Sequence, residues 1–190
     1  MSGALAWAGF ALQVLCFVEI SVASIRHFDR SRSSFGMLAI RVLSLGMALG
    51  LCAYWLGMPA PVPTPLSLAA LVLGLAGFAL LRLTLSQTRA GFLAVAYADN
   101  ESQALLTGGI YAVVRNPFYV AYLLHWVAWV PLPGGSALSV AGFAIFLALY
   151  AGAARQEEHQ LEESFGQLYR DYRSRTGRFL PHLHRLTGRG

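Results

Sequence analysis

The sequence predicts an all-α integral membrane protein with five transmembrane helices, its N-terminus outside and its C-terminus in the cytoplasm. Of its 190 residues, 56% are hydrophobic and only 12% are charged, which is about half the charged fraction of an average soluble domain. The apolar residues occur in long uncharged runs without period-two alternation, and backbone at membrane depth must form helices or a closed barrel. We therefore expect a multi-pass helical membrane protein.

Five apolar runs follow one another along the chain, and roughly 20 such residues are needed to span the hydrocarbon layer. They cover residues 3–25, 35–57, 66–85, 117–130 and 136–154. The fourth run would form a helix of only about 21 Å, at 1.5 Å per residue. We expect this helix to begin below the membrane surface, or the bilayer to be thinner around it.

The arginines orient these helices. They gather after the first, third and fifth runs, whereas the links at residues 58–65 and 131–135 carry no charge. With five spans, all positive segments lie on one side, and the positive-inside rule assigns this side to the cytoplasm. The net charge of +5 then reflects orientation and contact with anionic membrane lipids. No nucleic-acid partner is expected, and the sequence does not indicate an oligomeric state.

The chain is expected to form one membrane domain, residues 1–190. Its successive parts are three N-terminal spans, a polar inner connector with little helical periodicity, a helical hairpin and a C-terminal amphipathic cap, at residues 3–85, 86–116, 117–154 and 155–181. In the cap, apolar residues recur at helical spacing and form one stripe, at Leu161, Phe165, Leu168, Tyr169 and Tyr172. Pro181 is expected to end this helix, which either lies on the membrane surface or covers a site.

The cysteines and histidines show no pattern of a metal site or a disulfide framework. Cys16 and Cys52 lie inside predicted spans and are expected to be small core residues. The histidines have no ligand spacing, so no metal is expected. His125, beside Trp126 in the fourth run, is expected to be a packing residue.

Two polar clusters bracket the predicted hairpin, and because a hairpin returns to the side where it began, they should meet at one membrane face. Arg115 lies where the hairpin begins; it either extends its charge to the membrane surface or binds a carboxylate or phosphate through two hydrogen bonds. Asn116 and Pro117 mark a helix start, as N-cap and first helical residue. Glu157 and Glu158 follow the hairpin and could receive an amine or hydroxyls, or pair with neighbouring side chains.

These two clusters resemble a known family, through one stretch at residues 105–122 and a second at residues 157–172 followed by Pro181. The family is that of the isoprenylcysteine carboxyl methyltransferases and their wider membrane relatives, including phospholipid methyltransferases. The residues that carry the resemblance are Tyr111, Arg115, Pro117, Tyr119, Glu158, Leu161, Phe165, Gly166, Tyr169 and Tyr172. It covers about residues 82–181, and the first three spans are similar only in hydropathy. Asn116 stands where the family usually has a histidine.

The resemblance implies that S-adenosylmethionine binds at the inner end of the hairpin, under the C-terminal helix. The implied cofactor-binding residues are Tyr111, Arg115, Asn116, Pro117, Tyr119, Glu157, Glu158, Tyr169 and Tyr172, with Arg115 and Glu158 as the catalytic pair. Side-chain chemistry agrees with this assignment. Arg115 can bind the carboxylate of the cofactor, Glu158 with Glu157 can bind its ammonium or ribose hydroxyls, and tyrosines can flank its adenine or sulfonium.

The implied activity is methyl transfer to a lipophilic small molecule or lipid that enters from the bilayer, with a carboxylate as one candidate acceptor group. A carboxylate needs no general base, whereas an amine, thiol or phenol needs one, which Glu158 or His159 could supply. Two alternatives remain: a membrane double-bond reductase of the sterol reductase type that uses a nicotinamide cofactor, and a non-catalytic membrane scaffold. Cofactor binding distinguishes the three.

Overall fold

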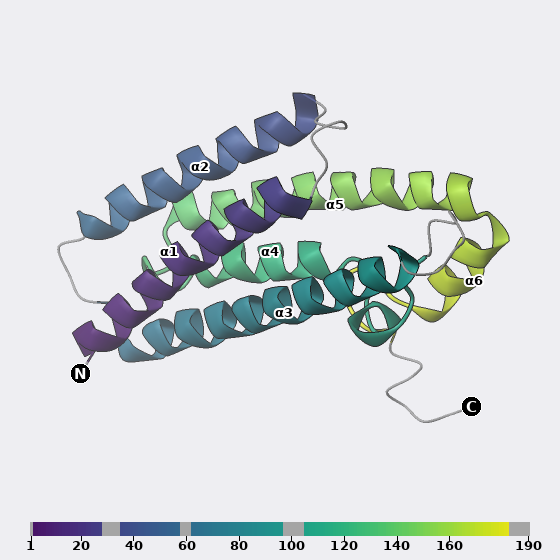
Figure 1. Cartoon of the computed structure of the whole chain (residues 1–190). Coiled ribbons are helices and arrows are strands. Elements are labelled where there is room, and N and C mark those ends of the chain that lie inside the picture. Colours follow the sequence, from purple (N-terminus) through teal and green to yellow (C-terminus); the bar gives the residue numbers. More distant parts are fainter. Residues whose placement is uncertain (1, 28–34, 58–61, 97–104, 183–190) are drawn as a thin grey trace. The chain divides into compact units, whose positions relative to one another are not determined.

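The computed structural model describes residues 2–27, 35–57, 62–96 and 105–182. Its elements, in chain order (Figure 1), are α1 (Ser2–His27), α2 (Phe35–Leu56), α3 (Thr64–Ala96), the 3-10 helix η2 (Gly109–Ala112), α4 (Pro117–Ala128), α5 (Ala137–Phe165) and α6 (Gln167–Arg175). In this part of the chain, extended backbone pairs at one isolated parallel bridge, between Val114 and Gly177. Residues 28–34 after the first run, residues 58–61 of the uncharged link and residues 97–104 of the polar connector lie outside the described residues.

Four of the described helices are long and apolar enough to cross a membrane. The segments that meet this condition are Gly3–Ser24, Leu38–Leu56, Thr64–Thr88 and Ala137–Phe165. Helix α4 has only 12 residues, about 18 Å at 1.5 Å per residue, so by itself it is shorter than the hydrocarbon layer. The all-helical fold is thus confirmed for the described residues, and four of their helices are candidates for membrane spans. The fifth crossing and the orientation remain predictions.

Contacts within the chain divide it into two units. The bundle unit comprises Met1–Ala79 and Ala121–Leu149, and the polar unit comprises Leu80–Val120 and Tyr150–Gly190. Helices α3, α4 and α5 each contribute residues to both units. The hydrophobic spans dominate the bundle unit, and the residues of both family motifs lie mainly in the polar unit.

In the bundle unit, α1 packs closely on α3 because small residues line their contact. A Cβ atom at Gly9 would lie 3.3 Å from a Leu132 methyl and 3.9 Å from the Ala70 Cβ, and the Gln13 side chain donates a hydrogen bond to the Ala70 carbonyl at 3.4 Å. Such close approach of helices through small residues is typical of membrane proteins, where burial of apolar surface supplies no attraction between helices.

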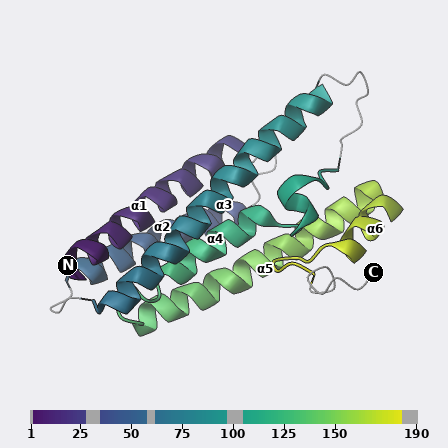
Figure 2. The ribbon, with the colours of Figure 1, turned by 90° about the horizontal axis from the view of Figure 1, so that it is seen from below.

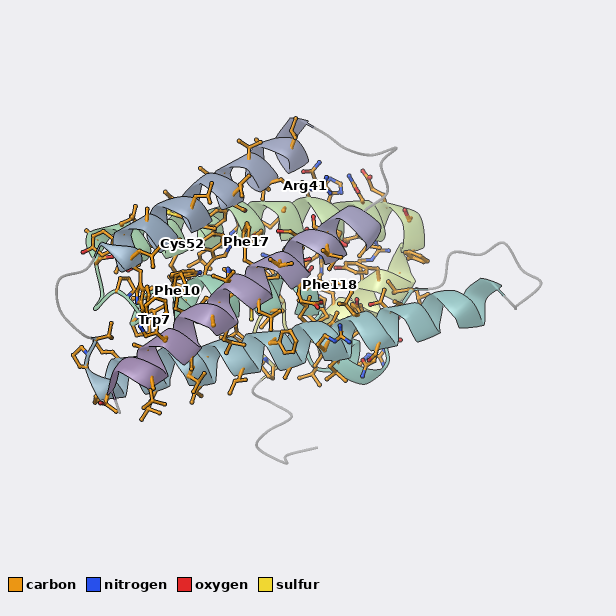
Figure 3. All side chains as sticks on the ribbon, turned by 60° about the vertical axis from the view of Figure 1, so that its left-hand side comes forward. Trp7, Phe10, Phe17, Arg41, Cys52 and Phe118 are labelled. Atoms are coloured by element: carbon orange, nitrogen blue, oxygen red, sulfur yellow. The ribbon has the colours of Figure 1, made fainter. Side chains whose placement is uncertain are left out.

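Aromatic rings fill the rest of the bundle unit. Phe10 stacks on Trp55 with ring centroids 4.3 Å apart, and Trp7 packs edge-to-face against the same indole. Figure 3 labels Trp7 and Phe10. Trp126 of α4 stacks on Phe146 of α5 at 3.9 Å. These contacts join α1 to α2 and α4 to α5.

Two helices in the polar unit differ from the sequence expectation. Helix α3 runs on to Ala96, so the first part of the connector at residues 86–116 is helical despite its weak periodicity. Extending an existing helix adds one hydrogen bond per residue and avoids the cost of nucleation, so its mixed polarity does not end α3.

The C-terminal cap is not the single amphipathic helix that was expected. Helix α5 continues to Phe165, Gly166 breaks it, and α6 then turns back beside its end (Figure 2). The predicted apolar stripe is therefore divided: Tyr169 and Tyr172 are buried, whereas Leu168 is 59% exposed. Helix α6 ends at Arg175, well before Pro181. Gly166 has φ 54°, a backbone conformation that favours glycine and that helical periodicity does not reveal.

Candidate cofactor site

The site in the polar unit begins with two backbone segments that lie side by side. The N–H of Arg115 donates to the Gly177 carbonyl at 2.8 Å, and the N–H of Asn116 donates to the Arg178 carbonyl at 3.3 Å. The Thr176 hydroxyl donates to the Tyr172 carbonyl at 2.8 Å and so ties this segment to the end of α6. The tail after α6 is thereby fixed against the segment that leads into α4.

Glu158, which lies on α5 and is only 4% exposed, accepts hydrogen bonds from three side chains at this junction. Its Oε1 accepts from Arg115 Nε at 3.2 Å and from Asn116 Nδ2 at 2.8 Å. Its Oε2 accepts from Arg178, from Nη2 at 2.7 Å and from Nε at 3.1 Å. We call these four residues the Glu158 cluster. A buried carboxylate needs this number of partners, because removing it from water is costly.

Arg115 is held on both sides. Besides Glu158, its guanidinium donates to the backbone carbonyls of Thr176 and of Arg173, the latter at 3.1 Å, and its side chain is 9% exposed. The alternative of an arginine that extends into the membrane surface is therefore wrong. Arg115 is a fixed, buried cation.

The cluster carries a net positive charge, since two guanidiniums face one carboxylate. The hydrogen bond to Glu158 raises the pKa of Arg178 above its usual value, so this charge is permanent. The Arg178 side chain is 34% exposed and the Arg115 side chain is 9% exposed, so Arg178 is the more accessible of the two arginines. An anionic group that reaches the cluster would be attracted by this excess charge.

Tyrosines surround the cluster. Tyr172 donates its hydroxyl to the Tyr111 carbonyl at 2.7 Å, and the Tyr111 hydroxyl lies 3.1 Å from the Thr88 hydroxyl of α3. Tyr169 is fully buried, and no hydrogen-bond partner for its hydroxyl is present among the described residues. Burial raises the pKa of Tyr169 and of Tyr172 to about 12, so both phenols stay protonated at neutral pH.

The remaining predicted site residues lie next to the cluster. Pro117 is buried and begins α4, and the Asn116 carbonyl accepts the first helical hydrogen bond, from Val120 at 3.1 Å. Asn116 and Pro117 thus mark the helix start as predicted, while the Asn116 side chain binds Glu158. Tyr119 packs beside Tyr150 with ring centroids 5.7 Å apart.

Glu157, the neighbour of the central carboxylate, is different in its surroundings. It is exposed, and the Tyr119 phenol is its hydrogen-bond partner. The structure therefore separates the two adjacent glutamates that the sequence treats alike: Glu158 belongs to the cluster, and Glu157 does not.

A cavity of about 610 Å³ opens beside the cluster, between the end of α5 and α6. Its lining is charged, with four arginines, three glutamates and one histidine: Arg155, Arg170, Arg173, Arg178, Glu158, Glu162, Glu163 and His159. Glu162 joins its two walls, because it pairs with Arg173 at 2.6 Å and with Arg170 at 3.6 Å. The volume lies in the usual range for small-molecule sites, roughly 300–1,000 Å³.

The sequence brought Arg115, Asn116 and Glu158 to one site, and the structure places them in direct contact. Sequence reasoning missed Arg178, which counted only as one of the arginines that follow the fifth apolar run. Its role depends on the turn at Gly166 and on the return of the tail along residues 114–116. Pro181 belongs to the family pattern and lies in the same tail, but it does not indicate which residues the tail contacts.

Comparison with known proteins supports the same region. The family model described as phospholipid methyltransferase matches residues 64–168, which is more than half of the chain. A relative, the methanethiol S-methyltransferase of Pseudomonas deceptionensis, is 34% identical over 80 residues, which are 42% of this chain and 29% of that protein. The match therefore spans less than a third of that relative's length. From the family match, the chain belongs to the phospholipid methyltransferase family of membrane methyltransferases.

Proposed function

We propose that this protein transfers a methyl group from S-adenosylmethionine to a lipophilic small molecule or lipid that reaches it from the bilayer. The observation that carries the proposal is the Glu158 cluster, which holds Arg115 as a fixed buried cation beside the charged cavity. Membership of a methyltransferase family supports the reaction class.

The residues present fit this cofactor. Arg178, which lines the cavity, offers its guanidinium to the carboxylate of the cofactor, and Arg115, buried in the same cluster, adds positive charge there. The cavity glutamate Glu162 offers acceptors to the ammonium or ribose hydroxyls. Glu158 is already occupied by three side chains, so it serves as the group that positions Arg115. A ligand that bonds to Glu158 directly would have to replace Arg178, its more exposed arginine partner.

The protein itself has little bond chemistry to perform, because the cofactor supplies a methyl group that its sulfonium already activates. Arg115 contributes by being immobile: Glu158 and two backbone carbonyls hold it, so a bound carboxylate takes one position. Fixing donor and acceptor in one geometry is how such a site accelerates the reaction.

The acceptor atom decides whether a base is needed. A carboxylate needs none, and the relative's name points to a thiol as a second candidate acceptor, which does need one. His159 lines the cavity and pairs with Glu163 at 3.5 Å, so it is the candidate base for a thiol or an amine.

The proposed membrane arrangement has five crossings, with the N-terminus outside and the C-terminus in the cytoplasm. Its support is the charge pattern of the sequence together with the short helix α4, which has 12 residues and would serve as the fourth crossing in a locally thin bilayer.

The test is methyl transfer by the protein reconstituted in liposomes, with methyl-labelled S-adenosylmethionine and three acceptors: phosphatidylethanolamine, a prenylated cysteine and an alkyl thiol. Label in one acceptor, lost in the Arg115→Ala variant and kept in Arg175→Ala, is the expected result. Arg175 is the matched control because it is exposed and lies outside the cavity lining. Absence of label from all three acceptors, together with binding of a nicotinamide cofactor, would favour a reductase.

A further inference from the structure

The core of the bundle unit contains polar atoms that have no hydrogen-bond partner among the described residues. They include Oε1 of Gln13, both ring nitrogens of His125 and Nε1 of Trp129. The three residues are 0%, 2% and 1% exposed. At membrane depth, an unpaired buried polar group is costly because no water is there to bind it, and an exception of this kind calls for a partner such as a water molecule or a ligand.

These atoms belong to surfaces that face each other. Phe10 of α1 contacts Trp129 with ring centroids 6.0 Å apart, and Phe17, two turns further along α1, contacts His125 at 6.1 Å. Figure 3 labels both phenylalanines on α1. Gln13 is three residues after Phe10 and four before Phe17, so it lies on the same helix face. The Gln13 amide is therefore placed between the levels of Trp129 and His125.

Glycines on α3 bring the helices close at this point. A Cβ atom at Gly77 would lie 3.4 Å from the backbone nitrogen of His125, and one at Gly74 would collide with the Gln13 amide and lie 2.9 Å from a Leu12 methyl. Gln13 uses its Nε2 to donate to the Ala70 carbonyl. Its Oε1 is the atom left over.

The unpaired atoms complement one another in hydrogen-bonding character. The Trp129 indole N–H only donates and the Gln13 Oε1 only accepts, while a neutral histidine offers one donor and one acceptor. Together these atoms need two donors and two acceptors, which one water molecule provides, whereas an alcohol hydroxyl with its single hydrogen can satisfy three of the four atoms. A charged group does not fit, because these three residues provide no counter-charge and a buried unpaired ion is far more costly.

We propose that Gln13, His125 and Trp129 form a binding site for a single neutral hydroxyl group in the core of the bundle unit. The hydroxyl comes either from a water molecule or from a small lipophilic alcohol. His125 then has a binding role in addition to the packing role that the sequence indicated. The site is independent of the proposed methyl transfer and of the Glu158 cluster.

The experiment follows the indole N–H of Trp129 by NMR in detergent-solubilised full-length protein. The chain has four tryptophans, so loss of one resonance in Trp129→Phe assigns the signal and the other three serve as references. Two measurements are made on the wild type: cross-relaxation between the Trp129 indole proton and water, and titration with cyclohexanol, with cyclohexane as the apolar control.

Either of two results supports the site. A water cross-peak at this buried indole proton identifies water as the source of the hydroxyl. A saturable shift with cyclohexanol, absent with cyclohexane, identifies an alcohol. In both cases the effect should weaken at least tenfold, in cross-peak intensity or in affinity, in Gln13→Leu. The proposal is overturned if the wild-type Trp129 signal is resolved and shows neither the water cross-peak nor the cyclohexanol shift. It is also overturned if one of these effects is present and Gln13→Leu leaves it unchanged.

Discussion

At the scale of single residues, Glu158 organises the site. One carboxylate of α5 accepts hydrogen bonds from Arg115 and Asn116, which precede α4, and from Arg178, which follows α6. Three segments that are distant in sequence therefore depend on one side chain. Removing one partner of a buried charge pair destabilises a protein far more than replacing the whole pair with apolar residues, because the remaining charge stays buried without a partner.

The first prediction follows from this dependence. Glu158→Gln removes the charge that two guanidiniums share, so we expect a loss of about 3 kcal/mol in unfolding free energy and severe loss of methyl transfer. Glu163→Gln is the matched control: its side chain is 68% exposed and pairs with His159, so a change within about 0.5 kcal/mol is expected. Equal effects of both variants on thermal unfolding and activity would contradict the role of Glu158.

The second residue prediction concerns pH. Burial raises the pKa of Tyr169 from 10.0 to about 12. The unfolded phenol ionises first as pH rises, so the stability that Tyr169 contributes is complete below pH 10 and is lost as pH rises toward 12. Thermal midpoints measured across this window should therefore fall more steeply for the wild type than for Tyr169→Phe. Tyr172 shares the shift, so some slope should remain; parallel curves for the two proteins would show that Tyr169 is not shielded from water.

At the scale of elements, apolar runs predicted where helices lie better than where they end. Phe35–Leu56 agrees with the second run almost residue for residue, because the hydrophobic requirement of the membrane dominates there. Outside it, α3 continues to Ala96 and α5 to Phe165. Beyond the apolar runs, the length of a helix depends on backbone geometry and tertiary contacts, and the hydrophobic pattern of the sequence does not reveal either.

The third prediction tests the break between α5 and α6. Gly166 has φ 54° and ψ −122°, while a Cβ atom there would meet nothing within 4 Å. Gly166→Ala should therefore cost about 1–2 kcal/mol through backbone strain alone and weaken cofactor binding through displacement of Arg178. Gly152→Ala, in α5 with equally open surroundings, should be neutral or stabilise by up to about 1 kcal/mol. A stabilising Gly166→Ala would mean that α5 and α6 form one helix.

At the scale of the whole molecule, the sequence predicted the class of fold, the family and three of the four residues of the Glu158 cluster. Arg115 and Glu158 could be paired because both ends of a hairpin return to one membrane face. Arg178 could not, since its place depends on a glycine turn and on backbone pairing between residues 114 and 177. The distinction between Glu157 and Glu158 likewise depends on which face of α5 each occupies.

The fourth prediction tests the number of crossings. In a variant with Cys16 and Cys52 replaced by alanine, single cysteines are placed at Ser2 and Arg175 and treated with a membrane-impermeant maleimide. Five crossings place the two positions on opposite sides, so only the Ser2→Cys protein should react in intact cells, and Arg175→Cys only after permeabilisation. Labelling of both positions from the same side would leave an even number of crossings, as expected if α4 does not span.

The most direct test of the central claim is calorimetric titration of the detergent-purified protein with S-adenosylhomocysteine. We predict binding that Arg115→Ala weakens by about tenfold to a hundredfold, the equivalent of one hydrogen-bonded charge, and that Arg175→Ala leaves unchanged. Unfolding curves must show that all three proteins are folded. Absence of binding to the folded wild type, or equal affinity in Arg115→Ala, would contradict the assignment of the Glu158 cluster as the cofactor site.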